Sequence, residues 1–291
     1  MRGDSSELVN RFAGWIVVSV VSTSADSGRG NFSFRGSRED KAETKIKSMS
    51  DDIEVKPLDA YSPMRLARVP DRNWRNSKWL AVSELLLAAL LFTLAAFHRL
   101  PLGRGPWLLV LGWSSLYARK IGWRGIGFKW YRGLTTTLAI GLGCGMLLEL
   151  FELFVSQPVL EHIIGKKADL SQFHDLRGNL RETALYILLV WIVAAFGEEM
   201  IYRGYLMNRV ADLMNRTRKA WTVSLIVVHV VFGLSHSYQG LTGVIDEGLM
   251  GVLLAALYLR TGRNLAVPII AHGVQDTIDL ILTFTGKYPG M

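Results

Sequence analysis

The stretch Trp191–Met207, WIVAAFGEEMIYRGYLM, places two adjacent glutamates and an arginine inside a segment that otherwise has the composition of a membrane helix. A charged side chain near the bilayer centre costs at least ~2.5–3.5 kcal/mol, so ionisable groups there usually pair or face a cavity and mark function. On a helix of about 3.6 residues per turn, Glu199 and Arg203 share a face and can pair. Glu198 points about 100° away, where no local cation lies. We therefore expect Glu198 to be a free carboxylate.

The composition predicts an all-α polytopic membrane protein. Half of the 291 residues are hydrophobic, the mean hydropathy is +0.24, and several long apolar runs follow one another. The net charge of +8 is spread over loops between these runs, which is typical of topology signals rather than of a nucleic-acid-binding face. We expect no nucleic-acid partner. The single cysteine, Cys144, excludes an intrachain disulfide.

Residues 1–60 differ in composition from the rest of the chain. Ser22–Asp59 is rich in Ser, Asp, Gly, Lys and Glu and has little to bury, so we expect a disordered or non-core extension. The apolar run Phe12–Val21 leaves a signal peptide open as the alternative. Because the true start could be Met49, it is also open whether residues 1–48 are translated or cleaved.

Residues 61–132 are expected to hold a basic flank, two spans and an interfacial segment, and residues 133–286 the membrane core. The bundle of about seven helices is predicted at Trp79–Phe97, Trp107–Tyr117, Gly133–Val155, about Glu182–Asn215, Ala220–Leu234, Gly248–Leu259 and Leu265–Thr285. Whether the short second span crosses the bilayer fully is open. Gly122–Arg132, which has tryptophans among its charged residues, is expected to lie at the membrane–water interface. Gln157–Arg181 is expected to be an aqueous loop.

Lysines and arginines collect on alternate sides of these spans. The N-terminal flank, Arg119–Arg132, Arg203–Lys219 and Arg260–Arg263 hold 5, 5, 5 and 2 of them, against 2, 4, 0 and 1 on the opposite side. Since cytoplasmic loops are enriched in these residues, the N-terminus is predicted to be cytoplasmic.

Helices four and five are expected to form a hairpin with its turn near residue 217. Glu198 and His236 are each nineteen residues from that turn, about 28 Å along the helix axis, so they lie at one height. In the last span His272 lies roughly 12 Å from its own turn, with Asp276 one turn deeper. If the hairpin protrudes by about 15 Å, all four share a depth, about one-third of the way into the membrane. We expect an intramembrane active site there.

These residues resemble a known family. Glu198-Glu199-xxx-Arg203, Phe232-xxx-His236 and His272-xxx-Asp276, in this order on successive apolar helices, look like the CAAX prenyl endopeptidase and bacteriocin-processing (CPBP, ABI-like) family of intramembrane proteases. The resemblance covers about Gly178–Leu282. It implies an endopeptidase in which a glutamate and a histidine activate water while a second histidine and a polar neighbour stabilise the oxyanion.

Carried onto this chain, the resemblance makes Glu198 and His236 base partners and His272 with Asp276 the oxyanion side. Glu199 and Arg203 are implied to be structural or substrate-orienting. Phe232, one turn before His236, is expected to wall the cavity and exclude water. Chemically, a desolvated carboxylate gains basicity, and a hydrogen-bond donor stabilises the tetrahedral oxyanion.

Metal dependence is left open, with a metal-free mechanism favoured. A Zn²⁺ site would need three protein ligands, which His236, His272 and one carboxylate, Glu198 or Asp276, could supply from separate helices. The HExxH spacing of many zinc proteases is absent from these motifs.

Two other functions compete with a protease. Further acidic residues near or within spans (Glu149, Glu152, Asp246, Glu247, Asp279) keep a proton-coupled transporter open, although the motif residues have no counterpart in the first half of the chain. The third alternative is a catalytically silent membrane scaffold. His229 is expected to be a core histidine.

The resemblance implies a peptide or protein substrate, prenylated at a CAAX-like end or otherwise membrane-associated, presented from the membrane or the cytoplasm. We expect an integral multi-pass protein of a bacterial plasma (inner) membrane, with the lipid bilayer as its surroundings. The sequence identifies neither the cleavage site nor the oligomeric state.

Overall fold

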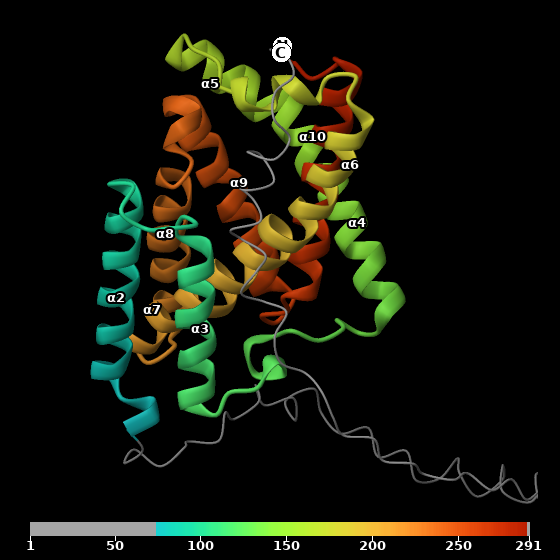
Figure 1. Ribbon diagram of the computed structural model, residues 1–291. Helices are drawn as coiled ribbons and strands as arrows, with labels where there is room; N and C mark the ends of the chain where they lie inside the picture. Colours follow the sequence, from blue (N-terminus) through green and yellow to red (C-terminus); the bar gives the residue numbers. More distant parts are fainter. Residues whose placement is uncertain (1–73, 290–291) are drawn as a thin grey trace, which may run out of the picture. The chain divides into compact units, whose positions relative to one another are not determined.

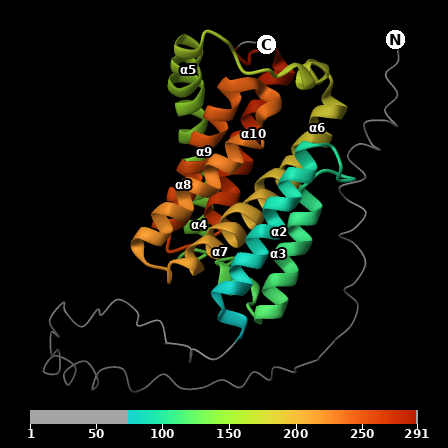
Figure 2. The ribbon, with the colours of Figure 1, turned by 90° about the vertical axis from the view of Figure 1, so that its left-hand side faces the viewer.

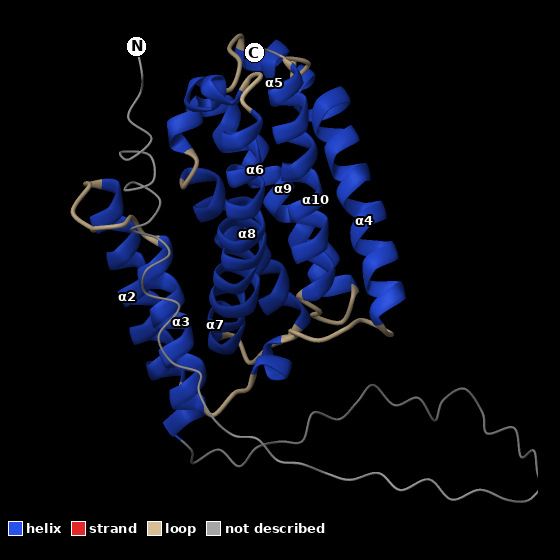
Figure 3. Ribbon diagram, turned by 45° about the vertical axis from the view of Figure 1, so that its right-hand side comes forward, coloured by secondary structure: helices blue, strands red, loops and turns tan. Residues whose placement is uncertain are grey.

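A computed structural model of the chain describes residues 74–289. Within this range the chain forms helices joined by turns and loops, without a strand (Figure 3). The expected extension of residues 1–60 lies outside the described residues. The domain boundaries proposed from the sequence therefore stay predictions.

The α-helices carry the labels of Figure 1: α2 (Lys78–Ala96), α3 (Gly105–Arg119), α4 (Leu134–Phe151), α5 (Gln157–Ile164), α6 (Leu180–Leu189), α7 (Met207–Leu213), α8 (Arg218–Leu234), α9 (Gly240–Arg260) and α10 (Ala266–Thr285). Two π-helical segments, η4 (Glu152–Ser156) and η6 (Val190–Leu206), connect α4 to α5 and α6 to α7 without a break. Short 3₁₀ turns are η2 (Trp74–Asn76), η3 (Trp123–Ile126), η5 (Ser171–Leu176) and η7 (Ser237–Gln239).

Four of the described helical segments are long and apolar enough to cross a membrane. They are Lys78–Ala96, Leu134–Ile164, Leu180–Leu213 and Ser237–Arg260. Three expected spans are not among them. Helix α3 has 15 residues, below the range of about 17–25 for a spanning helix, whereas α8 has 17 and α10 has 20. The all-helical membrane class is thus supported, and a bundle of seven spans stays a prediction.

Two predicted boundaries are wrong, both near carboxylates. The third expected helix, Gly133–Val155, does not end at Val155, because the chain continues as a helix from α4 through η4 into α5. Pro158 falls at the start of α5, where a proline is tolerated, and the preceding π-turn bonds the Gln157 N–H to the Glu152 carbonyl. Much of the expected aqueous loop Gln157–Arg181 is therefore helical, through α5 and η5. Helix α9 begins at Gly240 rather than Gly248.

The early start of α9 is explained by the partners of its two acidic residues. Asp246 accepts a hydrogen bond from Ser156 Oγ at 2.6 Å, and Glu247 accepts one from Gln239 Nε2 at 3.0 Å. With their charges bound inside the protein, neither carboxylate has to leave the membrane and end the helix.

The predicted hairpin is confirmed. Helix α7 ends at Leu213, and α8 begins at Arg218 with the Thr217 side chain accepting from the Ala220 N–H. The view of Figure 2 shows α7 and α8 meeting at this turn. Beside it, Glu84 of α2 binds Arg119 of α3 through Nε at 3.3 Å and Nη2 at 3.1 Å, and its carboxylate lies 3.7 Å from Arg209 of α7. This buried ion group links α2, α3 and α7.

Helix α10 packs along α4 through small residues of α4. A Cβ on Gly141 would lie 2.6 Å from the Ile270 side chain, and one on Gly145 would lie 2.6 Å from the Ala271 carbonyl oxygen. Small residues at such contacts let helix backbones approach closely in membranes. This contact sets the position of α10, which carries His272 and Asp276.

Gly145→Ala should lower the stability of the protein by about 1–3 kcal/mol, because the added methyl group meets backbone that cannot rotate away. Gly143→Ala, two residues earlier on the same helix, is the matched control, since a Cβ there has nothing within 4 Å. The control should be neutral or gain up to about 1 kcal/mol of helix propensity. Thermal unfolding of both variants in detergent measures the difference, and equal melting temperatures would contradict the packing argument.

Candidate active site

The four residues that the hairpin estimate brings to one depth line a single cavity. Glu198 comes from η6, His236 follows the end of α8, and His272 and Asp276 lie on α10. The cavity has a volume of about 240 Å³. The structure thus brings the four together, while their catalytic roles stay predictions.

Glu198 and Glu199 have different surroundings although they are neighbours. Glu198 borders the cavity and forms no hydrogen bond or ion pair with another of the described residues. Glu199 is fully buried and binds Arg203 Nη1 at 2.7 Å. The expected pair and the expected free carboxylate are both present, although η6 is a π-helix rather than the 3.6-residue helix assumed from the sequence.

His236 is oriented by the backbone one turn earlier. Its Nδ1 lies 2.9 Å from the Phe232 carbonyl oxygen, and because that oxygen can only accept, Nδ1 carries the proton. A neutral ring in this tautomer leaves Nε2 as an acceptor. His236 borders the cavity, so this nitrogen is the one available to water or substrate.

Phe232 does not wall the cavity as expected. Its ring packs edge-on against Tyr202 at 4.8 Å between centroids and lies 5.3 Å from the Arg203 guanidinium carbon. It is 2% exposed and is absent from the cavity lining, because α8 turns it towards η6. Its contribution to the site is the carbonyl group that holds His236 and a ring that packs against the His236 imidazole at 4.7 Å between centroids.

His272 is held between two carboxylates. Its Nδ1 lies 3.1 Å from Glu199 Oε1, and its Nε2 lies 3.5 Å from Asp276 Oδ2. Ionised carboxylates only accept hydrogen bonds, so an imidazolium ring with two N–H groups fits both neighbours. The bond to Glu199 joins η6 to α10, and no residue spacing in the sequence indicated it.

Arg203 holds the other side of Glu199. Besides the carboxylate it donates from Nη2 to the Gly251 carbonyl of α9 at 2.7 Å, and the side chain is fully buried. Neither Arg203 nor Glu199 borders the cavity. The pair therefore connects η6, α9 and α10 behind the site.

The cavity contains more carboxylates than the motifs indicated. Four acidic residues outside the motifs also line it: Glu152, Asp246, Glu247 and Asp279. Tyr186, Tyr238 and Tyr288 add hydroxyl groups. The acidic residues were noticeable in the sequence as charges within apolar runs, but nothing there showed that they face the same space as Glu198.

The depth expected for the site stays a prediction. His236 follows the last residue of α8, at the end of that helix opposite the turn after α7, in agreement with its expected distance from the turn. Ala168, Leu170 and Phe173, from the connection between α5 and α6, form part of the cavity wall. In Figure 1 α5 and the end of α10 lie at the end of the bundle away from α7.

The catalytic candidates do not form a compact set of metal ligands. Among residues 74–289, the three-residue group whose ligand atoms all lie within 4.8 Å of one another is Glu149, Glu152 and Asp279. The ring nitrogens of His272 face Glu199 and Asp276, and the second of these is itself one of the ligands considered for Zn²⁺. The metal-free mechanism favoured from the sequence therefore stays a prediction.

Comparison with known proteins bears on the same region. Residues 180–278 match the family described as "Type II CAAX prenyl endopeptidase Rce1-like", which supports a CAAX-type intramembrane protease at the family level. An Escherichia coli protein described as an "Uncharacterized 24.3 kDa protein" is 24% identical over 161 residues, which are 54% of this chain and 65% of that protein. The chain thus spans just under two thirds of that relative. No solved structure matches the chain. The Rce1-like match confirms the predicted resemblance and supports membership of the chain in the CPBP family.

Proposed function

We propose that the protein is an intramembrane endopeptidase that hydrolyses peptide bonds with a water molecule activated by Glu198 and His236. The observation that carries the proposal is that these two residues line one cavity together with His272, whose ring is held by Glu199. The family match and the four apolar helices support an integral membrane protease.

In the proposed reaction water lies between Glu198 and His236 Nε2. Glu198 takes a proton from the water as it attacks the scissile carbonyl carbon, and His236 Nε2 accepts the second hydrogen as a hydrogen bond. The proton held by Glu198 then passes to the leaving amide nitrogen. The Phe232 carbonyl keeps the histidine in the tautomer that this step needs.

The oxyanion of the tetrahedral intermediate is proposed to be stabilised from the α10 side. An imidazolium at His272 supplies positive charge and N–H donors, and in a site shielded from water such charge is worth more than in solution. Its Nε2 lies 3.5 Å from Asp276, longer than the usual charge-assisted hydrogen bond of about 2.7–2.9 Å, so this N–H can be shared with a substrate oxygen.

The mechanism is proposed without a metal. The ligand spacing described above supports this, and a carboxylate with a histidine can activate water unaided. Zn²⁺ held by His236, His272 and a carboxylate remains the competing arrangement, in which His272 Nδ1 would keep its bond to Glu199 while Nε2 binds the metal.

We propose peptide or protein substrates that reach the site from the membrane, with prenylated CAAX-like ends as one class. The proposed location is a bacterial inner membrane with a cytoplasmic N-terminus, which rests on the lysine and arginine counts of the loops. A proton-coupled transporter is the second candidate, favoured by the acidic residues that share the cavity.

Glu198→Gln should reduce cleavage by about 10²–10⁴-fold, because the amide keeps the shape of the side chain but cannot take a proton. Cleavage of a fluorescent peptide or prenyl-peptide by purified protein in lipid measures the effect. Asp175→Asn removes an exposed charge and is the control. Retained turnover in a monodisperse Glu198→Gln protein would rule out this base, and retained biological phenotype without any cleavage would favour the scaffold.

Arg203→Ala should cost about 3–5 kcal/mol of stability, because it leaves Glu199 buried without its cation and the Gly251 carbonyl without its donor. Thermal unfolding measures the loss, and Arg181→Ala, at an exposed position, is the control. Unchanged stability together with reduced cleavage would instead make Arg203 a substrate-orienting group.

Asp276→Asn should keep or raise activity, because the amide adds a donor to the oxyanion side while the metal-free base is untouched. Chelators should leave cleavage intact. The measurement is peptide cleavage together with the metal content of the purified protein. Stoichiometric zinc that disappears along with activity in Asp276→Asn would overturn the metal-free mechanism.

A further inference from the structure

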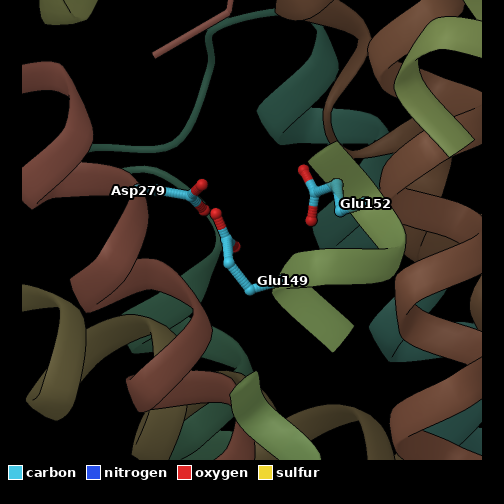
Figure 4. Close-up of side chains that lie close together, drawn as sticks. All are labelled: Glu149, Glu152 and Asp279. Atoms are coloured by element: carbon cyan, nitrogen blue, oxygen red, sulfur yellow. The ribbon is translucent and has the colours of Figure 1, made fainter. Parts of the chain in front are cut away.

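A second cluster of carboxylates lies between α4 and α10, outside the catalytic motifs. Glu149 belongs to α4, Glu152 to η4 and Asp279 to α10, and one oxygen from each lies within 4.8 Å of the others. Figure 4 shows the carboxylates of Glu149 and Asp279 pointing towards one another, with that of Glu152 on the far side of the same space. No Lys, Arg or His among the described residues forms an ion pair with any of the three.

Several oxygens in and beside this cluster are buried and have no hydrogen-bond partner among the described residues. Glu149 is 2% exposed, and neither of its carboxylate oxygens, nor Asp279 Oδ1, accepts a hydrogen bond from a donor group. The carboxyl groups of Glu149 and Asp279 contact one another, so they must share a proton or a cation. The buried Gln275 donates from Nε2 to Glu152, while its carbonyl oxygen, on the same amide, accepts nothing. Each buried acceptor without a donor costs about 1–3 kcal/mol, so this surplus of acceptors calls for a positive partner.

The type of atom indicates which partner fits. Carboxylate and amide oxygens are hard ligands, which Ca²⁺ and Mg²⁺ bind in preference to soft metals. Oxygens on opposite sides of Ca²⁺ lie about 4.6–5.2 Å apart, twice the Ca–O distance, whereas around Mg²⁺ they lie about 4.0–4.2 Å apart. The three oxygens lie within 4.8 Å of one another, a spacing that either ion could span. Ca²⁺ is favoured because its coordination geometry is flexible, whereas Mg²⁺ needs near-ideal octahedral geometry and usually keeps several waters.

We propose that Glu149, Glu152 and Asp279 form a Ca²⁺ site, and that the Gln275 amide rotates away from Glu152 to add its unpartnered carbonyl oxygen as a fourth protein ligand. The Gln157 amide, which donates to Glu152 Oε1 at 2.9 Å, orients one ligand. The cation links η4 to α10 one turn beyond Asp276, so it stabilises the helix that carries the oxyanion side of the cavity. The proposal stands independently of peptidase activity.

The test is Ca²⁺ binding by the full-length protein, purified in detergent and freed of divalent cations with a chelator. Equilibrium dialysis with radioactive ⁴⁵Ca²⁺ should give one ion per chain, and the melting temperature should rise with CaCl₂ more steeply than with MgCl₂. Glu149→Gln and Asp279→Asn should raise the dissociation constant for Ca²⁺ at least about tenfold, since even residues that only orient metal ligands contribute that much.

Two controls separate this site from other acidic groups. Asp175→Asn and Glu198→Gln should bind Ca²⁺ as the wild-type protein does. The proposal is overturned if the wild-type protein binds no Ca²⁺, which would mean that the three carboxylates share protons. Binding that survives Glu149→Gln, or that is lost in Glu198→Gln, would also overturn it. If the cluster variants do not fold, the stoichiometry and the Ca²⁺-dependent melting of the wild-type protein decide alone.

Discussion

The arrangement of the site depends on the buried pairing of Glu199 with Arg203 and His272. Arg203 anchors the carboxylate to α9 through the Gly251 carbonyl, and the same carboxylate oxygen holds His272 of α10. Three helical segments thus meet at one charged group that water does not reach. In a membrane interior such a group is costly unless every partner is in place, so it favours one relative position of the segments over others.

Glu198 depends on this arrangement although it takes no part in it. Because Glu199 uses its charge on Arg203 and His272, the adjacent carboxylate is left at the cavity edge, where Ala194 and Val190 provide an apolar border. In the proposed mechanism the two neighbours therefore divide two tasks that a single carboxylate could not perform, since a base has to exchange its proton and a structural anion has to keep its charge.

Local pattern was enough to predict much of this protein. Apolar runs located α2, α8 and α10, residue spacing gave the Glu199–Arg203 pair, and distance from the hairpin turn brought Glu198 and His236 together. These features depend on contacts along one helix or across one turn. Prediction failed at the start of α9, which was expected only after Asp246 and Glu247, because the Asp246 partner Ser156 is ninety residues away in sequence. The bond between Glu199 and His272 was missed for the same reason.

The acidic residues within α9 and η4 made the helix ends hard to predict. Their hydrogen-bond partners explain why these segments remain helical inside the protein. A carboxylate within an apolar run either ends the helix or finds a partner, and here Ser156, Gln157, Gln239 and Gln275 supply neutral donors. Neutral donors satisfy hydrogen bonds but do not cancel charge. When they are ionised, Asp246 and Glu247 add to the negative potential of the cavity that Glu198 and Asp276 also line. That potential favours positive charge throughout the cavity, which is consistent with an imidazolium at His272.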